Sequence, residues 1–170
     1  MAAELNIEFS WHDLERNDPI EVLLVLVARQ TLEKCQVDNG NAGLVITNDK
    51  TIKELNKIHR GLDEITDVLS FSNNFEGQYY GEDESLKTIS LLVDFVLPPG
   101  QTENIGEVVV CLPQAMRQAG AGTTGIRLEL GKLVAHGFLH LLGYDHIENQ
   151  DRELMEQLEA DILNIVGHND

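Results

Sequence analysis

The sequence predicts an α+β fold in which a small mixed β-sheet of about four strands packs with about five helices. Two observations predict it. Short apolar or alternating stretches, which are typical of strands, are separated along the chain by longer stretches with apolar residues at helical spacing. Polar cap residues, proline and glycine stand at the ends of the longer stretches, as they do at helix ends. At 170 residues the chain has the length of one domain, which we expect to span residues 1–170.

The expected elements follow in order along the chain. Strands are predicted at residues 5–11, 44–47, 66–72 and 108–112. Helices are predicted at residues 18–37, at 50–59, from Pro113 to the glycine-rich stretch at 120–125, around the histidines that follow, and at 149–166. In the last helix apolar residues recur at Leu154, Leu158, Ile162 and Ile165, so we expect that face to pack on the core.

One region, at about residues 73–105, forms a longer acidic excursion. It contains glycines around an apolar segment at residues 89–97. A functional interpretation makes it a lid or a hairpin for a partner. We favour the simpler interpretation, a surface excursion that carries one extra strand.

Three of the six histidines, His136, His140 and His146, lie within eleven residues. The first two are four residues apart, which places them one turn apart on one face of a helix. Gly143 permits the left-handed turn that ends a helix, so the chain can turn back and present His146 as a third ligand. Three neutral imidazoles leave one position open on a divalent metal, as in a catalytic zinc site. We therefore expect one divalent ion, Zn²⁺, to bind here.

One residue separates this spacing from the metzincin protease pattern H-E-x-x-H-x-x-G-x-x-H. Gly137 stands where those proteases have a glutamate that takes the proton from the water at the metal. Because glycine has no side chain, peptide hydrolysis by that route is disfavoured. Activation of a water by the metal stays available.

Three segments of the chain share the patterns and the order of one known family. Residues 136–146 are H-G-F-L-H-L-L-G-Y-D-H, residues 55–71 are L-N-K-I-H-R-G-L-D-E-I-T-D-V-L-S-F, and residues 105–111 are I-G-E-V-V-V-C. Together they resemble the YbeY endoribonucleases, also called rRNA maturation factors, and the similarity runs from about residue 5 to residue 166. Two positions depart from the family pattern: His59 stands where an aromatic residue is usual, and Ile65 replaces a proline.

The resemblance implies a metal-dependent endoribonuclease that cuts single-stranded RNA in ribosomal RNA maturation, including 16S rRNA processing, and in ribosome quality control. It implies that His136, His140 and His146 bind the metal and that Arg60 is catalytic. A guanidinium binds phosphate oxygens through paired hydrogen bonds and neutralises charge that grows in the transition state. The nucleophile is either a metal-activated water or the 2′-OH of the RNA, and a 2′,3′-cyclic phosphate end would indicate the second.

The formal net charge of −17 disfavours RNA binding through the overall field of the protein. Binding therefore needs a local basic patch. Lys53, Lys57 and Arg60 recur at helical spacing, which supports a common substrate-binding face, and Arg127 and Lys132 are further candidates. The acidic surface suits docking on a basic protein, so we expect the ribosome, its small-subunit proteins or an assembly GTPase as partners. We expect binding neither to DNA nor to a membrane.

Two other functions stay open. In a metallopeptidase or a related hydrolase, Glu107 or Asp67 would have to approach the metal as the base. In a ribosome-assembly factor, the metal would be mainly structural. Asp67 and Asp145 are also candidates to hold the second ring N–H of a metal-bound histidine, although Asp145 suits a turn equally well.

Cysteines and termini add little chemistry. Cys35 and Cys111 belong to no CxxC pair, so we expect neither a disulfide framework nor a second metal site. The N-terminus has no basic region followed by an apolar one, which a secretion signal needs. The longest apolar run, residues 22–28, is too short to span a bilayer. We expect a cytoplasmic monomer.

Overall fold

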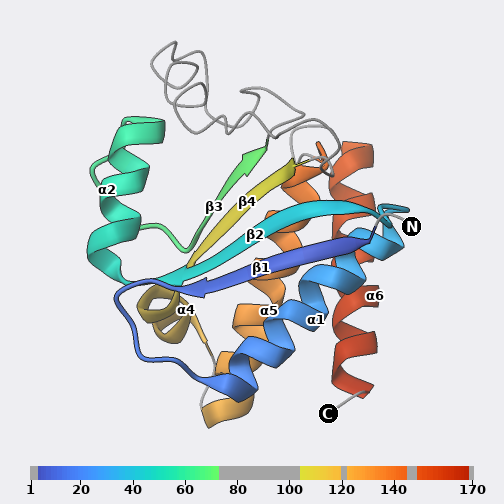
Figure 1. The fold of residues 1–170 in the computed structure, drawn as a ribbon, viewed down its shortest axis with the longest axis horizontal. Helices are drawn as coiled ribbons and strands as arrows, with labels where there is room; N and C mark the ends of the chain where they lie inside the picture. Colours follow the sequence, from blue (N-terminus) through green and yellow to red (C-terminus); the bar gives the residue numbers. More distant parts are fainter. Residues whose placement is uncertain (1–3, 73–103, 120–121, 145–148, 169–170) are drawn as a thin grey trace.

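The computed structural model describes residues 4–72, 104–119, 122–144 and 149–168. These residues form one sheet from β1 (Leu5–Trp11), β2 (Gly40–Thr47), β3 (Val68–Ser72) and β4 (Asn104–Cys111). The helices are α1 (Asp18–Lys34), α2 (Asp49–Arg60), α4 (Leu112–Gln118), α5 (Gly122–Leu141) and α6 (Asn149–His168) (Figure 1). The predicted α+β class, with about four strands and five helices, is confirmed within the described residues.

The sheet is mixed, with the strand order β1-β2-β4-β3. β1, β2 and β4 run parallel, and β3 runs antiparallel to β4. One register row crosses all four strands and joins Glu8, Gly43, Glu107 and Phe71. β3 stands last in this order and therefore forms one edge of the described sheet.

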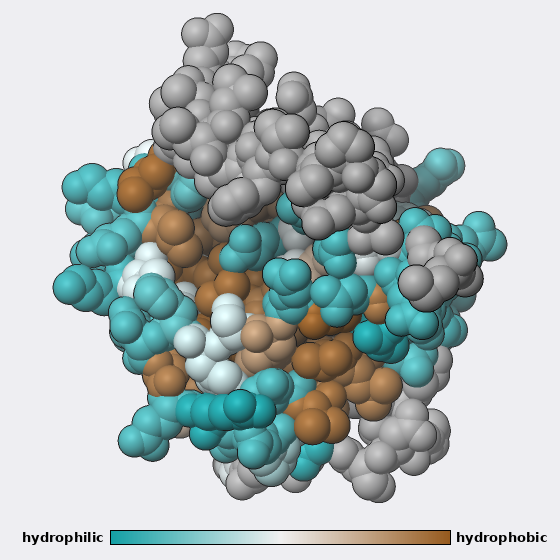
Figure 2. Space-filling model, in the orientation of Figure 1, coloured by the Kyte–Doolittle hydropathy of each residue, from teal (hydrophilic) through white to brown (hydrophobic). Residues whose placement is uncertain are grey.

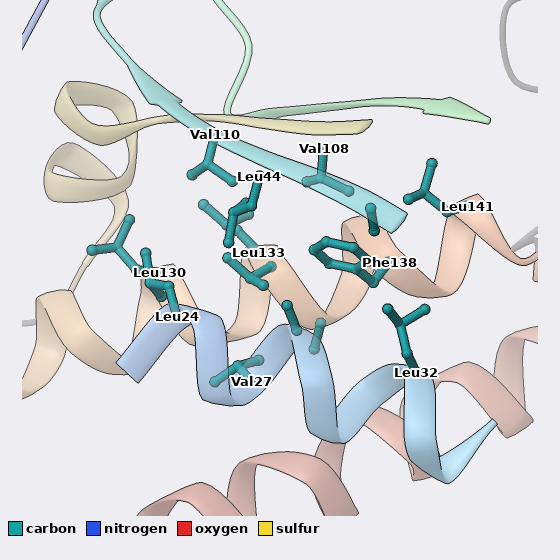
Figure 3. Packing of buried hydrophobic residues seen from close by; sticks show 14 of the residues in the cluster. Leu24, Val27, Leu32, Leu44, Val108, Val110, Leu130, Leu133, Phe138 and Leu141 are labelled. Carbon is teal, nitrogen blue, oxygen red and sulfur yellow. The ribbon is translucent and has the colours of Figure 1, made fainter. Parts of the chain in front are cut away.

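Alternate strand residues point to opposite faces of the sheet. On one face Leu44, Val108 and Val110 are fully buried together with residues of α1 and α5, such as Leu24 and Phe138 (Figure 3). On this side α6 contacts both α1 and α5, which adds another helical layer.

The opposite face of the sheet carries a smaller apolar cluster. Leu69, Val109 and Cys111 pack there against Ile52 of α2. Figure 1 shows α2 standing beside the sheet, away from α1, α5 and α6. This face is therefore covered by helices to a smaller extent than the first one.

The helix starts agree with the cap residues in the sequence. Asn17 caps α1, where its side-chain oxygen accepts a hydrogen bond from the N–H of Ile20 at 3.2 Å, and Pro19 lies in the first turn. Asn48 caps α2 in the same way through the N–H of Thr51 at 3.0 Å. These side chains satisfy N–H groups that have no partner inside the helix.

Some predicted boundaries and faces are wrong. β2 and β4 begin at Gly40 and Asn104, about four residues earlier than predicted, because glycine and polar residues interrupt the apolar pattern in the first half of both strands. Of the apolar face predicted for α6, Ile162 is buried and Leu158 half-buried, but Leu154 is 42% exposed and Met155 is buried in its place. The apolar spacing therefore predicted the buried face of this helix correctly at Ile162 and wrongly at Leu154.

Two further expectations can be compared with the structure only in part. The predicted excursion at residues 73–105 lies almost wholly outside the described residues, so its strand and its role stay predictions. Of the helices that are described, none combines the length and the apolar character that crossing a membrane requires.

Candidate functional site

The candidate metal site is built on α5. His136 and His140 lie one turn apart, and their Nε2 atoms are 2.8 Å from each other. Two imidazoles on a tetrahedral zinc, at about 2.0–2.1 Å from the ion, would hold their nitrogens roughly 3.4 Å apart. A small rotation of either ring gives that separation, so the pair fits two ligands of one metal.

The third predicted ligand is not tested. His146 and Asp145 lie outside the described residues, and within the described part of the chain no three potential ligands come together. The turn that leads toward His146 is described up to Tyr144. Gly143 has a φ of 92°, its N–H bonds to the carbonyl of His140, and the N–H of Tyr144 bonds to the carbonyl of Leu139. This hydrogen-bond pattern ends a helix with a left-handed residue, as predicted for Gly143.

The histidine pair has a carboxylate partner that the sequence analysis missed. Oε1 of Glu159, on α6, lies 2.8 Å from Nδ1 of His136. Metal-binding histidines usually bond their second ring nitrogen to such a carboxylate, which orients the ring. The predicted partner Asp67 does not fill this place, because its carboxylate accepts hydrogen bonds from the N–H of Val68 and from Gln118.

Gly137, between the two histidines, lies against the sheet. A Cβ atom built there would be 2.6 Å from Cγ1 of Val108 and 3.2 Å from Cγ2 of Val68. Two hydroxyls of β3 also hold α5 close to the sheet: Ser70 donates a hydrogen bond to the carbonyl of Gly137 and Ser72 donates one to that of Leu141, each at 2.9 Å. A glutamate at position 137 would have to displace this packing. The observed packing therefore leaves no room for the protease base at this position.

The predicted RNA-binding residues lie on α2. Arg60 is the last residue of that helix and is half-buried, while Lys53 and Lys57 are exposed one turn apart. Gly61, with a φ of 71°, ends the helix. The structure groups these basic residues on one helix, and that helix packs on the face of the sheet opposite to the one covered by α5, which carries the histidine pair.

The further basic candidates lie on α5, the helix of the histidines. Arg127 is half-buried near its start, and Lys132 is exposed. They do not join the α2 group, because the sheet again lies between the two helices.

On the α2 side the sheet is hollowed. The hollow has a volume of about 410 Å³ and is lined by Ser10, Trp11, His12, Val45, Thr51, Leu55, Glu107 and Val109. Figure 2 shows apolar surface on this face between α2 and the strands, interrupted by polar side chains. Burial, and to a smaller extent the charge of Glu8, raises the pKa of Glu107. Because Glu107 lines this hollow on the α2 side, it faces away from the histidine helix and is not placed to act as the base of the metal site.

The comparisons with known proteins agree on one family. The sequence model of the family described as "Endoribonuclease YbeY" matches residues 6–167 of this chain. The chain is 41% identical over 131 residues to an endoribonuclease YbeY of Dehalococcoides mccartyi, which covers 76% of this chain and 77% of that protein. It is 34% identical over 166 residues to that of Moorella thermoacetica, with coverages of 95% and 98%.

A solved structure also resembles this fold. The solution structure of TM1509 from Thermotoga maritima has a TM-score of 0.58 and 22% sequence identity. The alignment covers 96% of this chain and 90% of that one. At this identity the likeness concerns the fold.

Proposed function

The chain belongs to the YbeY endoribonuclease family, and we propose that it cuts single-stranded ribosomal RNA with one divalent metal bound by His136, His140 and His146. Membership makes it an endoribonuclease. The bound metal and the choice of single-stranded ribosomal RNA as the substrate are the proposed parts. The observation that supports the metal is the histidine pair, whose Nε2 atoms lie 2.8 Å apart on a helix that ends at Gly143.

Each proposed residue has a distinct part in the reaction. His136 and His140 would hold the metal through Nε2, and His146 would complete the ligand set. Bound Zn²⁺ supplies a Lewis acid that polarises a phosphate oxygen and lowers the pKa of a water. Arg60 binds phosphate oxygens through its guanidinium and neutralises the charge that develops on them. Lys53 and Lys57 extend this contact along α2.

The path of the RNA follows from the separation of these groups. α2 and α5 lie on opposite faces of the sheet, and the edge strand β3 contacts both helices: the ring of Phe71 lies against that of His59 on α2, and Ser70 donates a hydrogen bond to the carbonyl of Gly137 on α5. A strand of RNA that contacts Arg60 and the histidines would therefore pass around the β3 edge. Double-stranded RNA is stiffer and bulkier, so this path favours a single strand.

The biological setting is part of the same proposal. We place the enzyme in the cytoplasm, as a monomer, in 16S rRNA maturation and ribosome quality control. The net charge of −17 opposes unassisted RNA binding and supports docking on basic small-subunit proteins or on an assembly GTPase.

The test is cleavage of an unstructured, end-labelled RNA with metal content measured on the same samples. Wild type should cut the RNA and carry close to one zinc per chain. His140→Ala should lose both the metal and the cleavage. Arg60→Ala should keep the metal and lose about 10²–10³-fold in rate, the usual effect of removing one group that stabilises transition-state charge. The chemistry of the product ends distinguishes the 2′-OH from water as the nucleophile.

A matched control is Arg16→Ala. Arg16 lies in the exposed loop before α1, where it pairs with Asp18. This variant should cut as wild type does. Folded, zinc-loaded wild type that leaves both free RNA and ribosome-bound RNA intact would contradict the proposal and favour an assembly factor. Unfolding of His140→Ala would point the same way, because the metal would then be structural.

A further inference from the structure

Glu159 contacts a ligand of the proposed metal site, and the role inferred for it rests on that site. Four polar or charged residues are buried among the described residues: Thr31, Thr47, Asn56 and Glu159. The first three donate side-chain hydrogen bonds to backbone carbonyls, those of Val27, His12 and Glu64. Glu159 is the one carboxylate of the four, and its partner is the imidazole of His136.

Burial of a carboxylate is costly unless a hydrogen bond or a charge compensates it. Glu159 lies between Met155 and Ile162, both fully buried, so α6 holds it on its apolar face. Three other carboxylates of α6 can reach water: Glu153 and Glu156 are exposed and Asp161 is half-buried. The position of Glu159 is therefore set by packing of α6, and its side chain is directed at α5.

The contact determines which nitrogen of His136 carries the proton. A neutral imidazole has one N–H and one lone pair. With Nδ1–H donating to Oε1 of Glu159, Nε2 of His136 keeps its lone pair. That lone pair faces Nε2 of His140, 2.8 Å away. Nε2 of His136 can bind a metal only through this lone pair, so the tautomer with the proton on Nδ1 is the one that can act as a ligand.

We propose that Glu159 is a positioning residue that fixes His136 in the tautomer and the orientation that bind the metal. The ligand set thus depends on a helix that lies beyond α5 and contributes no ligand itself. Loss of the carboxylate should weaken metal binding about 10–100-fold, the usual effect of removing a partner of a metal-bound histidine.

The experiment measures Zn²⁺ affinity by competition with a chromophoric chelator, for wild type, Glu159→Gln and Glu159→Leu. The leucine variant should show the full loss. The glutamine variant should show a smaller one, because its amide oxygen still accepts from Nδ1–H but carries no charge. Glu156→Gln is the matched control, an exposed glutamate on the same helix, and should bind zinc as wild type does.

A second readout separates positioning from folding. Nitrogen NMR shifts of the His136 ring in the metal-free protein should report an Nδ1–H tautomer in wild type and a mixture in Glu159→Gln, with both chains folded. Unchanged zinc affinity and unchanged tautomer in the glutamine variant would overturn the inference while leaving the proposed function intact. Wild type that binds no zinc would overturn both. If the leucine variant does not fold, the glutamine variant still decides.

Discussion

The two faces of the sheet differ in how they are covered, and the proposed chemistry is divided between them. On the α5 side, Phe138, Leu24 and Val108 are fully buried, and the histidine pair belongs to the helix that packs there. On the α2 side a small cluster adjoins a hollow that contains Glu107, and Arg60 ends the covering helix. The proposed metal ligands His136 and His140, which would have to hold a fixed geometry, thus lie on the closely packed side. The residues proposed to bind a flexible strand sit on the more open side.

The largest expected contrast is between two phenylalanines. Phe138→Ala should lower the free energy of unfolding by about 3–5 kcal/mol, because it leaves a cavity in a fully buried site. Phe71→Ala, on the partly exposed side beside His59, should cost roughly 1–2 kcal/mol, because less apolar surface is lost. Urea denaturation of both variants measures this. Equal losses would mean that the two faces contribute alike.

A smaller contrast lies within α5 itself. Gly137→Ala should destabilise the fold by about 1–3 kcal/mol, because the new methyl group would overlap Val108. Gly131→Ala, in the same helix, would meet Cδ2 of Leu163 at 3.4 Å and Cγ2 of Val27 at 3.8 Å, both ordinary contacts, and should stabilise the fold by up to about 1 kcal/mol through the better helix propensity of alanine. The same denaturation experiment compares them. A stabilising Gly137→Ala would show that α5 can move away from the sheet without cost.

The open side should carry its own dependence on pH. Burial raises the pKa of Glu107, so the folded state holds this proton more tightly than the unfolded state does. Its contribution to stability is complete below the unfolded pKa of about 4.3 and is lost as the pH rises through the raised folded pKa. Glu107→Gln should therefore match wild type at low pH and become the more stable protein above that window. Urea midpoints between pH 4 and 8 test this, and a constant difference would contradict it.

The smallest effect is expected at an exposed ion pair on the α2 side. Arg117 of α4 binds Asp49 of α2 through two hydrogen bonds of 2.7 and 3.0 Å, and this holds the pKa of Asp49 below its usual value. The contribution is present above the unfolded pKa and disappears as the pH falls through the lowered one. Arg117→Met should return the pKa of Asp49 toward its usual value in an NMR titration. The stability change should be slight and smaller still in 1 M salt. A large loss of stability would contradict this and would mean that the ion pair is a main contact holding α2 and α4 together.

Local spacing predicted part of this site and packing determined the rest. His136 and His140 are neighbours because four residues make one helical turn, and Gly143 ends the helix because it tolerates a positive φ. Glu159 was missed because its role depends on the rotation of α6, which follows from contacts with α1 and α5 rather than from an apolar stripe. That α2, with Arg60, and α5, with the histidines, cover opposite faces of the sheet depends on tertiary packing, which the spacing of residues within one segment does not encode.

The serine hydroxyls of β3 have a consequence for the alignment of the chain. Two residues of a strand advance about 6.6 Å, and four residues of a helix advance about 6.0 Å. Ser70 and Ser72 can therefore bond in step to the carbonyls of Gly137 and Leu141. If β3 slipped by one residue along β4, Leu69 and Phe71 would take those places, and both hydroxyls would turn to the other face. A one-residue slip of β3 would therefore cost both hydrogen bonds to the helix that carries the histidines. These two bonds thus favour the observed pairing of β3 with β4.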